Sequence, residues 1–184
     1  MTIDQRHRLL DLLKRYHPWD GADAAQARRL REFVEANENC FDRSNLTGHV
    51  TGSTWLVDAS GKRVLLTHHK KLGKWLQLGG HADGNPDVLA VAMKEAREES
   101  GIEKIAPVSQ QIFDLDIHPI PAHGTEPAHF HYDIRFALQA AGAGDFIVSE
   151  ESRSLAWIEI EKIETLTEEE SLLRMARKWR QLAF

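Results

Sequence analysis

The segment of residues 87–100 constrains this chain most, because it has the pattern of a helix whose glutamates lie on the side that ought to be buried. Successive residues of an α-helix are about 100° apart, so residues three and four apart share a face. The apolar stripe comprises Val88, Leu89, Val91, Ala92 and Ala96. The stripe continues through Glu95, Glu98 and Glu99, while Ala90, Lys94 and Arg97 fall on the opposite side.

A glutamate-rich helix usually turns its carboxylates to water. Here three carboxylates at positions i, i+3 and i+4 would repel one another, and burial would raise that cost unless a cation compensates. Carboxylates are hard oxygen ligands, which favour Mg²⁺ or Mn²⁺ over Zn²⁺, and such ions commonly share their ligands with substrate phosphates. The helix therefore predicts a divalent-metal site that acts on phosphate.

The segment Gly80 to Ile102 resembles the Nudix box, written G-x5-E-x7-R-E-U-x-E-E-x-G-U, where U is apolar. Gly80 matches the first glycine, and Gly101-Ile102 matches the ending. Between them, the helix glutamates of the motif correspond to Glu95, Glu98 and Glu99, with Ala96 at the apolar position. The order of hairpin, glycine-rich loop, helix and further strands is also similar to the family over about residues 45–165.

The resemblance implies an α/β fold, namely an α/β/α sandwich with a mixed β-sheet. It also implies hydrolysis of a nucleoside diphosphate linked to another group. Glu95, Glu98 and Glu99 would hold Mg²⁺ or Mn²⁺, with the Gly80 carbonyl as a further ligand, and these glutamates are the candidate catalytic residues. The metal would polarise a phosphoryl oxygen and help to activate water.

Two positions depart from the motif. Lys94 replaces the arginine and keeps its charge without the two-pronged geometry. Pro86 replaces the early glutamate and suits the start of a helix. The proline is compatible with a lost metal contact, with reduced activity, or with replacement of the carboxylate by Asp83 or Asp87, and the sequence leaves these three open.

The chain of 184 residues fits one domain with an accessory element. We predict an N-terminal helical appendage over residues 1–42, with helices at about 3–17 and 22–38, that packs on the domain or forms a homodimer contact. The hydrolase domain then spans residues 43–184. Strands are predicted at 49–58, 63–67, 109–117, 129–138 and 155–160, and a last helix from a capping box at 167–170.

A second polar group lies in the strand predicted at 129–138. Alternation puts His129, His131, Asp133 and Arg135 on one face. His129 and His131 are candidate catalytic residues if this face points towards the metal helix, and it could equally be a solvated face. His118 and His123 rank below them. His81, Lys70 and Lys74 are candidate substrate-binding residues beside the diphosphate site. Glu126, Glu150 and Glu151 are further candidates for the catalytic base.

Composition limits the setting. The single cysteine, Cys40, excludes an internal disulfide, and the charged N-terminal segment lacks the apolar run of a signal peptide or membrane span, so we expect a cytoplasmic protein. The net charge of −5 argues against a nucleic-acid partner. The basic stretch near the end is interpreted as complementing a helix dipole, with polyanion binding as the lesser option; it contains Arg174, Arg177, Lys178 and Arg180.

Two other functions compete with hydrolysis of a small nucleotide-like diphosphate. An isopentenyl-diphosphate isomerase-like enzyme shares the fold, but those isomerases need a cysteine in the site, whereas Cys40 precedes the first strand. A noncatalytic nucleotide-binding sensor would fit Pro86, although the three intact glutamates argue against it. No segment outside the box identifies the base, sugar or coenzyme of a substrate.

Overall fold

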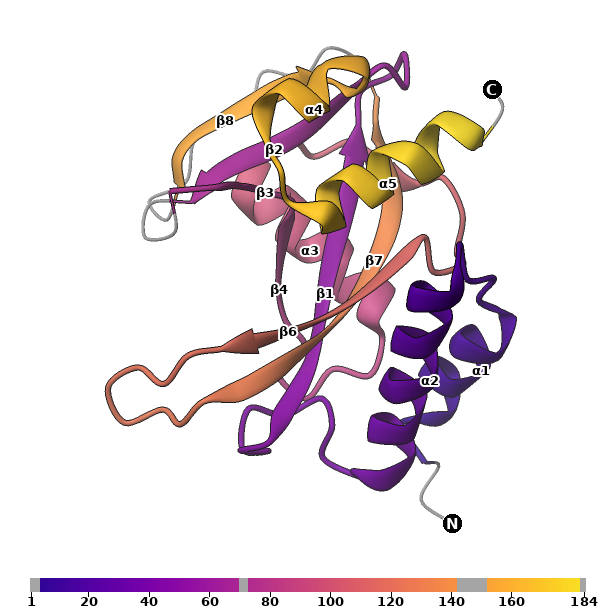
Figure 1. Ribbon diagram of the computed structural model, residues 1–184, viewed down its shortest axis with the longest axis vertical. Helices are drawn as coiled ribbons and strands as arrows, with labels where there is room; N and C mark the ends of the chain where they lie inside the picture. Colours follow the sequence, from indigo (N-terminus) through magenta and orange to yellow (C-terminus); the bar gives the residue numbers. More distant parts are fainter. Residues whose placement is uncertain (1–3, 70–72, 142–151, 183–184) are drawn as a thin grey trace.

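The computed structural model describes residues 4–69, 73–141 and 152–182. Its helices are α1 (His7–Arg15), α2 (Gly21–Ala36), α3 (Val88–Ser100), α4 (Ile163–Leu166) and α5 (Glu170–Gln181), with a 3-10 turn at Ile160–Lys162. Its strands are β1 (Gly48–Val57), β2 (Arg63–His69), β3 (Trp75–Leu76), β4 (Leu78–His81), β5 (Ile105–Pro107), β6 (Asp114–Ile120), β7 (His129–Ala140) and β8 (Ser152–Glu159). These strands form one curled sheet, from which β6 and β7 project as a long arm (Figure 1).

The sheet is mixed. Its main path runs β3-β2-β1-β7-β5, while β4 pairs with β1, β6 with β7 and β8 with β2. The central strands β1 and β7 are parallel, from Gly48 opposite Phe130 to Val57 opposite Gln139, and the other pairings are antiparallel. This register decides which side chains of neighbouring strands share a face, since alternate residues of a strand point to opposite faces.

Two hydrophobic cores lie on opposite faces of the sheet. One joins α1, α2 and α3 to the sheet and includes Leu30, Val50 and Ala92. The other packs α5 against the sheet through Trp55, Met175 and other residues. In Figure 1, α5 lies in front of the sheet and α3 behind it. The predicted α/β/α sandwich with a mixed sheet is therefore confirmed.

Helix α3 has clear signals at both ends. The Asp87 side chain accepts a hydrogen bond from the backbone N–H of Ala90 and so caps the first turn. Gly101 ends the helix in the left-handed conformation at φ 70°, which a side chain would disfavour. The helix predicted at 87–100 is confirmed, and its buried residues include Val88, Val91, Ala92 and Ala96 of the predicted stripe.

Several predicted boundaries differ from the structure. The strand predicted at 109–117 is β6, at Asp114–Ile120, and a separate short strand, β5, precedes it. The last helix begins at Glu170, and its N-cap, Glu169, makes no side-chain cap hydrogen bond. The predicted capping box is thus wrong, because the Thr167 hydroxyl accepts a hydrogen bond from Glu169 N–H before the helix begins. Within the described residues, no helix has the length and apolarity to cross a membrane.

A buried ionic network ties the N-terminal helices to the last helix. The Asp114 carboxylate, fully buried on β6, accepts hydrogen bonds from Arg135, Arg174 and Lys178. Lys178 also donates to Asp23 of α2 at 2.8 Å. The interpretation of the basic stretch as a dipole complement is therefore wrong for Arg174 and Lys178, because both are buried in ion pairs with aspartates from other elements.

Candidate active site

The box helix and strand β4 meet at Gly80. A Cβ atom built on Gly80 would lie 2.6 Å from both Cδ and Oε2 of Glu95, so only glycine leaves room for that carboxylate. One residue earlier, Gly79 N–H donates to Glu99 Oε1 at 2.8 Å. Strand β4 is in turn fixed by pairing with β1, where Gly80 stands opposite Gly52. Glu95 and Glu99 are thus held against the backbone of β4.

Glu98 differs from the other two glutamates. Its side chain is 58% exposed, compared with 19% for Glu95. The expectation that all three lie on the buried side is wrong for Glu98, because this residue lies at the edge of the apolar stripe, next to the exposed Lys94 with which it pairs. Glu98 nevertheless shares a cation with Glu95, since Lys94 Nζ lies 3.1 Å from Glu95 Oε1 and 3.0 Å from Glu98 Oε2.

The Lys94 ammonium shows that this position attracts a cation. Hydrogen bonds to Glu98 and Glu95 raise the pKa of Lys94 above its usual value. A divalent metal needs the same feature, namely carboxylate oxygens from two side chains converging on one point, and here the Gly80 backbone lies beside them. The residues present therefore fit a hard cation such as Mg²⁺ or Mn²⁺.

The two aspartates considered as replacements for the missing motif glutamate are engaged elsewhere. Asp83 pairs with Arg43 at 2.7 Å, and Asp87 caps α3 while pairing with Arg8 at 2.5 Å. Pro86 lies between them, just before the first turn of α3. Both of these aspartates therefore already have an arginine partner in the described structure.

Four neighbouring strands contribute histidines to one face of the sheet. His49 of β1 stands opposite His131 of β7, which stands opposite His118 of β6. His81 of β4 stands opposite Thr51, two residues from His49 and on the same face. His129 precedes His131 on that face, so the predicted alternation is confirmed. The His49 ring centroid lies 4.9 Å from those of His129 and His131 and 5.0 Å from that of His81.

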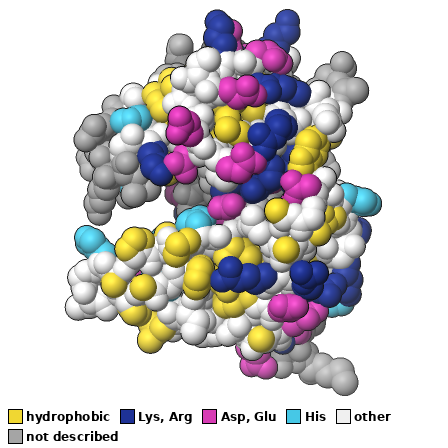
Figure 2. All heavy atoms as spheres, viewed as in Figure 1, with side chains coloured by type: hydrophobic (Ala, Val, Ile, Leu, Met, Phe, Trp, Pro, Cys, Tyr) yellow, Lys and Arg dark blue, Asp and Glu magenta, His cyan; other side chains and the backbone are white. Residues whose placement is uncertain are grey.

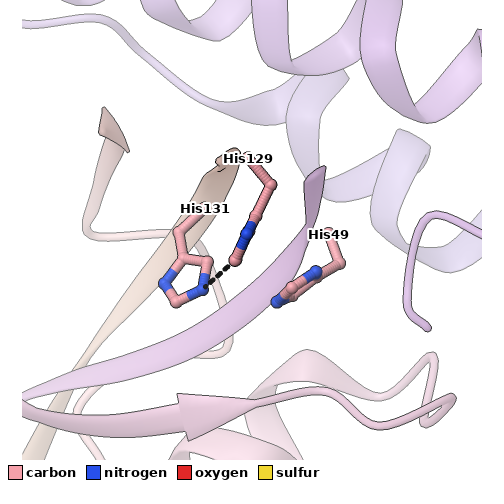
Figure 3. Close-up of side chains that lie close together, drawn as sticks. All are labelled: His49, His129 and His131. Carbon is pink, nitrogen blue, oxygen red and sulfur yellow. Dashed lines mark hydrogen bonds between the residues drawn. The ribbon is translucent and has the colours of Figure 1, made fainter. Parts of the chain in front are cut away.

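Three of the histidines on this face, His49, His81 and His131, have lowered pKa values; Figure 3 shows His49 and His131 beside His129. Burial, followed by the proximity of His81 and His129, lowers the pKa of His49 to about 4. Burial, followed by the proximity of His81 and His118, lowers the pKa of His131 to about 3. Burial also lowers the pKa of His81. At neutral pH these imidazoles therefore carry no charge and keep a nitrogen lone pair.

A buried aspartate lies beside the histidines. Asp133 accepts hydrogen bonds from the hydroxyls of Thr51 and Ser53 at 2.8 and 2.7 Å, and Arg135 donates to it at 2.8 Å. Burial by itself would raise the pKa of Asp133, but the charge and hydrogen bonds of Arg135 outweigh it and lower that pKa. Asp133 is therefore an anion at neutral pH.

The box and the histidine face meet in one cavity of about 260 Å³. Glu99, Gly79 and Gly80 line one side, while His131 and Asp133 line another. The rest of the cavity wall is formed by Thr51, Ser53, Thr67, His69, Leu76, Gln77, His81, His118 and Ile120. Figure 2 shows the molecule hollowed between the β6–β7 arm and the region of β2 and β3, with histidine side chains beside the hollow.

The other candidate residues are placed less favourably. Lys74 pairs with Glu169 at 2.5 Å and is absent from the cavity wall, as is Glu126 in the loop between β6 and β7. His129 is buried behind His131 and does not line the cavity either. Lys70, Glu150 and Glu151 lie outside the described residues.

Sequence reasoning missed His49 and the part played by Asp133. Alternation along β1 puts His49 on the face of Thr51 and Ser53, which was visible in the sequence, but its parallel pairing with β7 was not. A larger cavity of about 1040 Å³ lies elsewhere, lined by Tyr16, Trp19, Phe113 and their neighbours. That cavity has no box residue in its wall, so its size does not make it the candidate active site.

Strand β4 with its two glycines, helix α3 with its three glutamates, and the polar cavity beside them define an α/β/α protein with a site suited to a cation and a phosphate. The model of the NUDIX domain family matches residues 49–179 of the chain. The chain therefore belongs to the Nudix family, and the prediction of a Nudix-type hydrolase is confirmed at the level of the family. No curated protein sequence matches the chain significantly.

Solved structures support the same fold. The chain is similar to a C. elegans Ap4A hydrolase in a binary complex, with 18% identity and a TM-score of 0.57, covering 71% of this chain and 94% of the other. A NUDIX-family hydrolase from Clostridium perfringens has 23% identity and a TM-score of 0.54, with coverage of 73% and 98%. The E. coli dihydroneopterin triphosphate pyrophosphohydrolase has 16% identity and a TM-score of 0.57, with coverage of 70% and 92%.

Proposed function

We propose that this protein is a Mg²⁺- or Mn²⁺-dependent hydrolase that cleaves a diphosphate linkage in a nucleoside diphosphate joined to another small group. The observation that carries the proposal is the packing of the Glu95 carboxylate against Gly80, beside a cavity that Glu99 helps to line. Membership of the Nudix family supports the same chemistry. A cavity with carboxylates on one side and neutral histidines on the other suits a small phosphorylated ligand.

When bound, the metal would neutralise phosphate charge and lower the pKa of a bound water molecule. Glu95 and Glu98 are the residues that we assign to hold it, because their carboxylates already share the Lys94 ammonium. Glu99 orients the β4 backbone through Gly79 N–H and reaches the same cavity. The Gly80 carbonyl is assigned as a further ligand because the Gly80 backbone lies beside the Glu95 carboxylate.

His131 and His81 face the reacting group in this proposal. Both line the cavity, and the lowered pKa of each ring leaves a free lone pair that can accept a proton or a hydrogen bond. Asp133 keeps its negative charge behind them and would exclude a second anion from the deep end of the cavity. The phosphates would therefore lie towards Gly80, and His129 would support His131 from behind.

The substrate class rests on the family and on the size of the cavity. The similar structures include enzymes named for Ap4A and for dihydroneopterin triphosphate, both nucleotide-like polyphosphates. We propose a soluble nucleotide-like substrate and a cytoplasmic setting, which suits a chain whose single cysteine is a buried free thiol. The homodimer contact proposed for residues 1–42 would be checked by the mass of the protein in solution.

An isomerase that uses a cysteine is a poorer fit. Cys40 is fully buried in the hydrophobic core and is absent from the wall of the candidate cavity. Burial raises the pKa of its thiol to about 12, so the reactive thiolate is scarce at neutral pH. A noncatalytic sensor remains the second candidate because Pro86 stands where the motif has a glutamate.

The test is a panel of nucleoside diphosphate-linked sugars, dinucleoside polyphosphates and nucleoside triphosphates, incubated with Mg²⁺ or Mn²⁺ while phosphate and nucleotide release are measured. Glu98→Gln should lower turnover on the preferred substrate by about a hundredfold or more, because the metal loses a carboxylate ligand. Glu103→Gln, an exposed residue beyond the box, is the matched control and should keep its activity. Binding without turnover across the panel would favour the sensor.

A further inference from the structure

We propose a second metal site in this protein, formed by His49, His129 and His131 and suited to a borderline transition-metal ion of the Zn²⁺ type. The site is distinct from the glutamates of the box. Imidazole nitrogen is a preferred ligand of Zn²⁺, Fe²⁺, Ni²⁺ and Cu²⁺, whereas Mg²⁺ prefers oxygen. The inference concerns these three rings alone and holds whether or not the box supports hydrolysis.

The three rings have the spacing of a ligand set. One nitrogen from each of His49, His129 and His131 lies within 4.8 Å of the others. His129 Nε2 and His131 Nε2 are 3.3 Å apart (Figure 3). Two nitrogens bound to the same tetrahedral zinc at about 2.0–2.1 Å are separated by roughly 3.3 Å. This pair therefore needs little movement to hold one ion, and His49 needs a small closure.

His129 also has the outer partner that a metal-binding histidine requires. Its Nδ1 lies 2.9 Å from the carbonyl oxygen of Pro127. A carbonyl can only accept a hydrogen bond, so Nδ1 carries the proton and Nε2 presents its lone pair towards His131. A backbone carbonyl that fixes the tautomer in this way is the usual outer partner of a histidine ligand.

His49 supplies the independent observation. His49 is 1% exposed, and both nitrogens of its ring are buried with no hydrogen-bond partner among the described residues. A buried polar group without a partner is costly, and such groups in native proteins usually indicate a bound water molecule, a bound ion or a function. An ion between the three rings would bind one of these nitrogens and relieve that cost.

The site borders the cavity through His131, which belongs to the set of three rings and also lines the cavity. The His81 ring centroid lies 5.0 Å from those of both His49 and His131, and His81 and His131 line the cavity that Glu99 also lines. Three protein ligands with one open position is the arrangement of zinc sites that bind water or substrate. The ion would thus lie at the end of the cavity away from α3 and face the same bound molecule.

Cobalt is the probe for this site, because tetrahedral Co²⁺ absorbs visible light and Zn²⁺ displaces it without absorbing. We expect the chelator-treated protein to bind one equivalent of Co²⁺ at micromolar or lower concentration and to release it to Zn²⁺ but not to millimolar Mg²⁺. The variant Glu95→Gln/Glu98→Gln/Glu99→Gln should keep this binding. His131→Gln should weaken it by about a hundredfold, and His118→Gln, a neighbouring histidine outside the set, should not.

A measurement on the unaltered protein covers the case in which His131→Gln does not fold. X-ray absorption at the zinc edge should show a first shell of nitrogen with the outer scattering of several imidazoles. An all-oxygen shell, or loss of Co²⁺ binding in the glutamate variant but not in His131→Gln, would assign the ion to the box and overturn the proposal. The absence of any bound Co²⁺ or Zn²⁺ would overturn it as well.

Discussion

Glu95 lies so close to Gly80 that a methyl group at position 80 would overlap its carboxylate, with only 2.6 Å between the new Cβ and Glu95 Cδ. The contact joins the box helix to strand β4 and explains why the first position of the motif must be glycine. A side chain at position 80 should therefore disturb function more than stability. The overlapping atoms belong to the flexible end of the Glu95 side chain, which can move away without unfolding the protein.

Gly80→Ala should therefore lower diphosphate hydrolysis by about a hundredfold, since it displaces a proposed metal ligand by an ångström or more. The free energy of unfolding should fall by less than about 1 kcal/mol, because Glu95 can move towards solvent. Turnover on the preferred substrate and urea unfolding would measure the two effects. Gly21→Ala, at a position with open space around it, is the control. Unchanged turnover in Gly80→Ala would contradict the assignment of Glu95.

Lys94→Gln should tighten the binding of Mg²⁺ at the box. The Lys94 ammonium is paired with Glu95 and Glu98, so a metal has to displace it or tolerate its charge. Exposed ion pairs contribute about 0.2–1 kcal/mol, which corresponds to a decrease of at most about fivefold in the Mg²⁺ concentration that gives half-maximal activity. Lys104→Gln makes the same charge change outside the box and should have little effect. An increase in the required Mg²⁺ would show that Lys94 supports the site.

Asp114→Asn should destabilise the protein strongly. Asp114 is fully buried and accepts hydrogen bonds from Arg135, Arg174 and Lys178, so its neutralisation removes the one carboxylate that all three buried cations share and leaves an excess of buried positive charge. Loss of one member of a buried ion pair typically costs about 3–5 kcal/mol. Urea unfolding would measure it. Asp11→Asn, which breaks an exposed pair with Lys14, should cost less than about 1 kcal/mol. Similar losses in both variants would refute the importance of the network.

Cys40 should be inert in the folded protein. Burial raises the pKa of its thiol to about 12, so the thiolate fraction at pH 8 is about one in ten thousand in the folded state, against a substantial fraction once the chain unfolds. An aromatic disulfide reagent at pH 8 should label the native protein slowly and the urea-unfolded protein within seconds. Rapid labelling under native conditions would show that the segment before β1 opens readily.

The sequence predicted the fold and the carboxylates of the site because both depend on local patterns. Gly79, Gly80, the apolar stripe of the helix and Gly101 all lie within one segment of the sequence. Their spacing alone predicts a helix that packs against a strand containing glycine. The helical wheel was wrong for Glu98, which is exposed, because the exposure of a residue at the edge of the stripe depends on what packs beside the helix and not on the helix itself.

The histidine group could be predicted only in part. Alternation within β7 correctly placed His129 and His131 on one face, since that is a property of a single strand. The addition of His49 depends on the parallel pairing of β1 with β7, two strands separated by about half of the chain. No local pattern contains that pairing, and the same reason applies to the aspartates that pair with Arg174 and Lys178.

The ionic network around Asp114 has a consequence for synthesis of the chain. Lys178 joins Tyr16 and Asp23, which precede it by 162 and 155 residues, to an aspartate of β6. Contacts over such separations form late, because the intervening chain must first be ordered. During synthesis Asp23 can pair with Lys178 only after the last helix has emerged, whereas its hydrogen-bond donors Tyr16 and Trp19 precede it in the chain. The shared ammonium of Lys178 therefore makes the docking of α5 the step that completes the buried charge network.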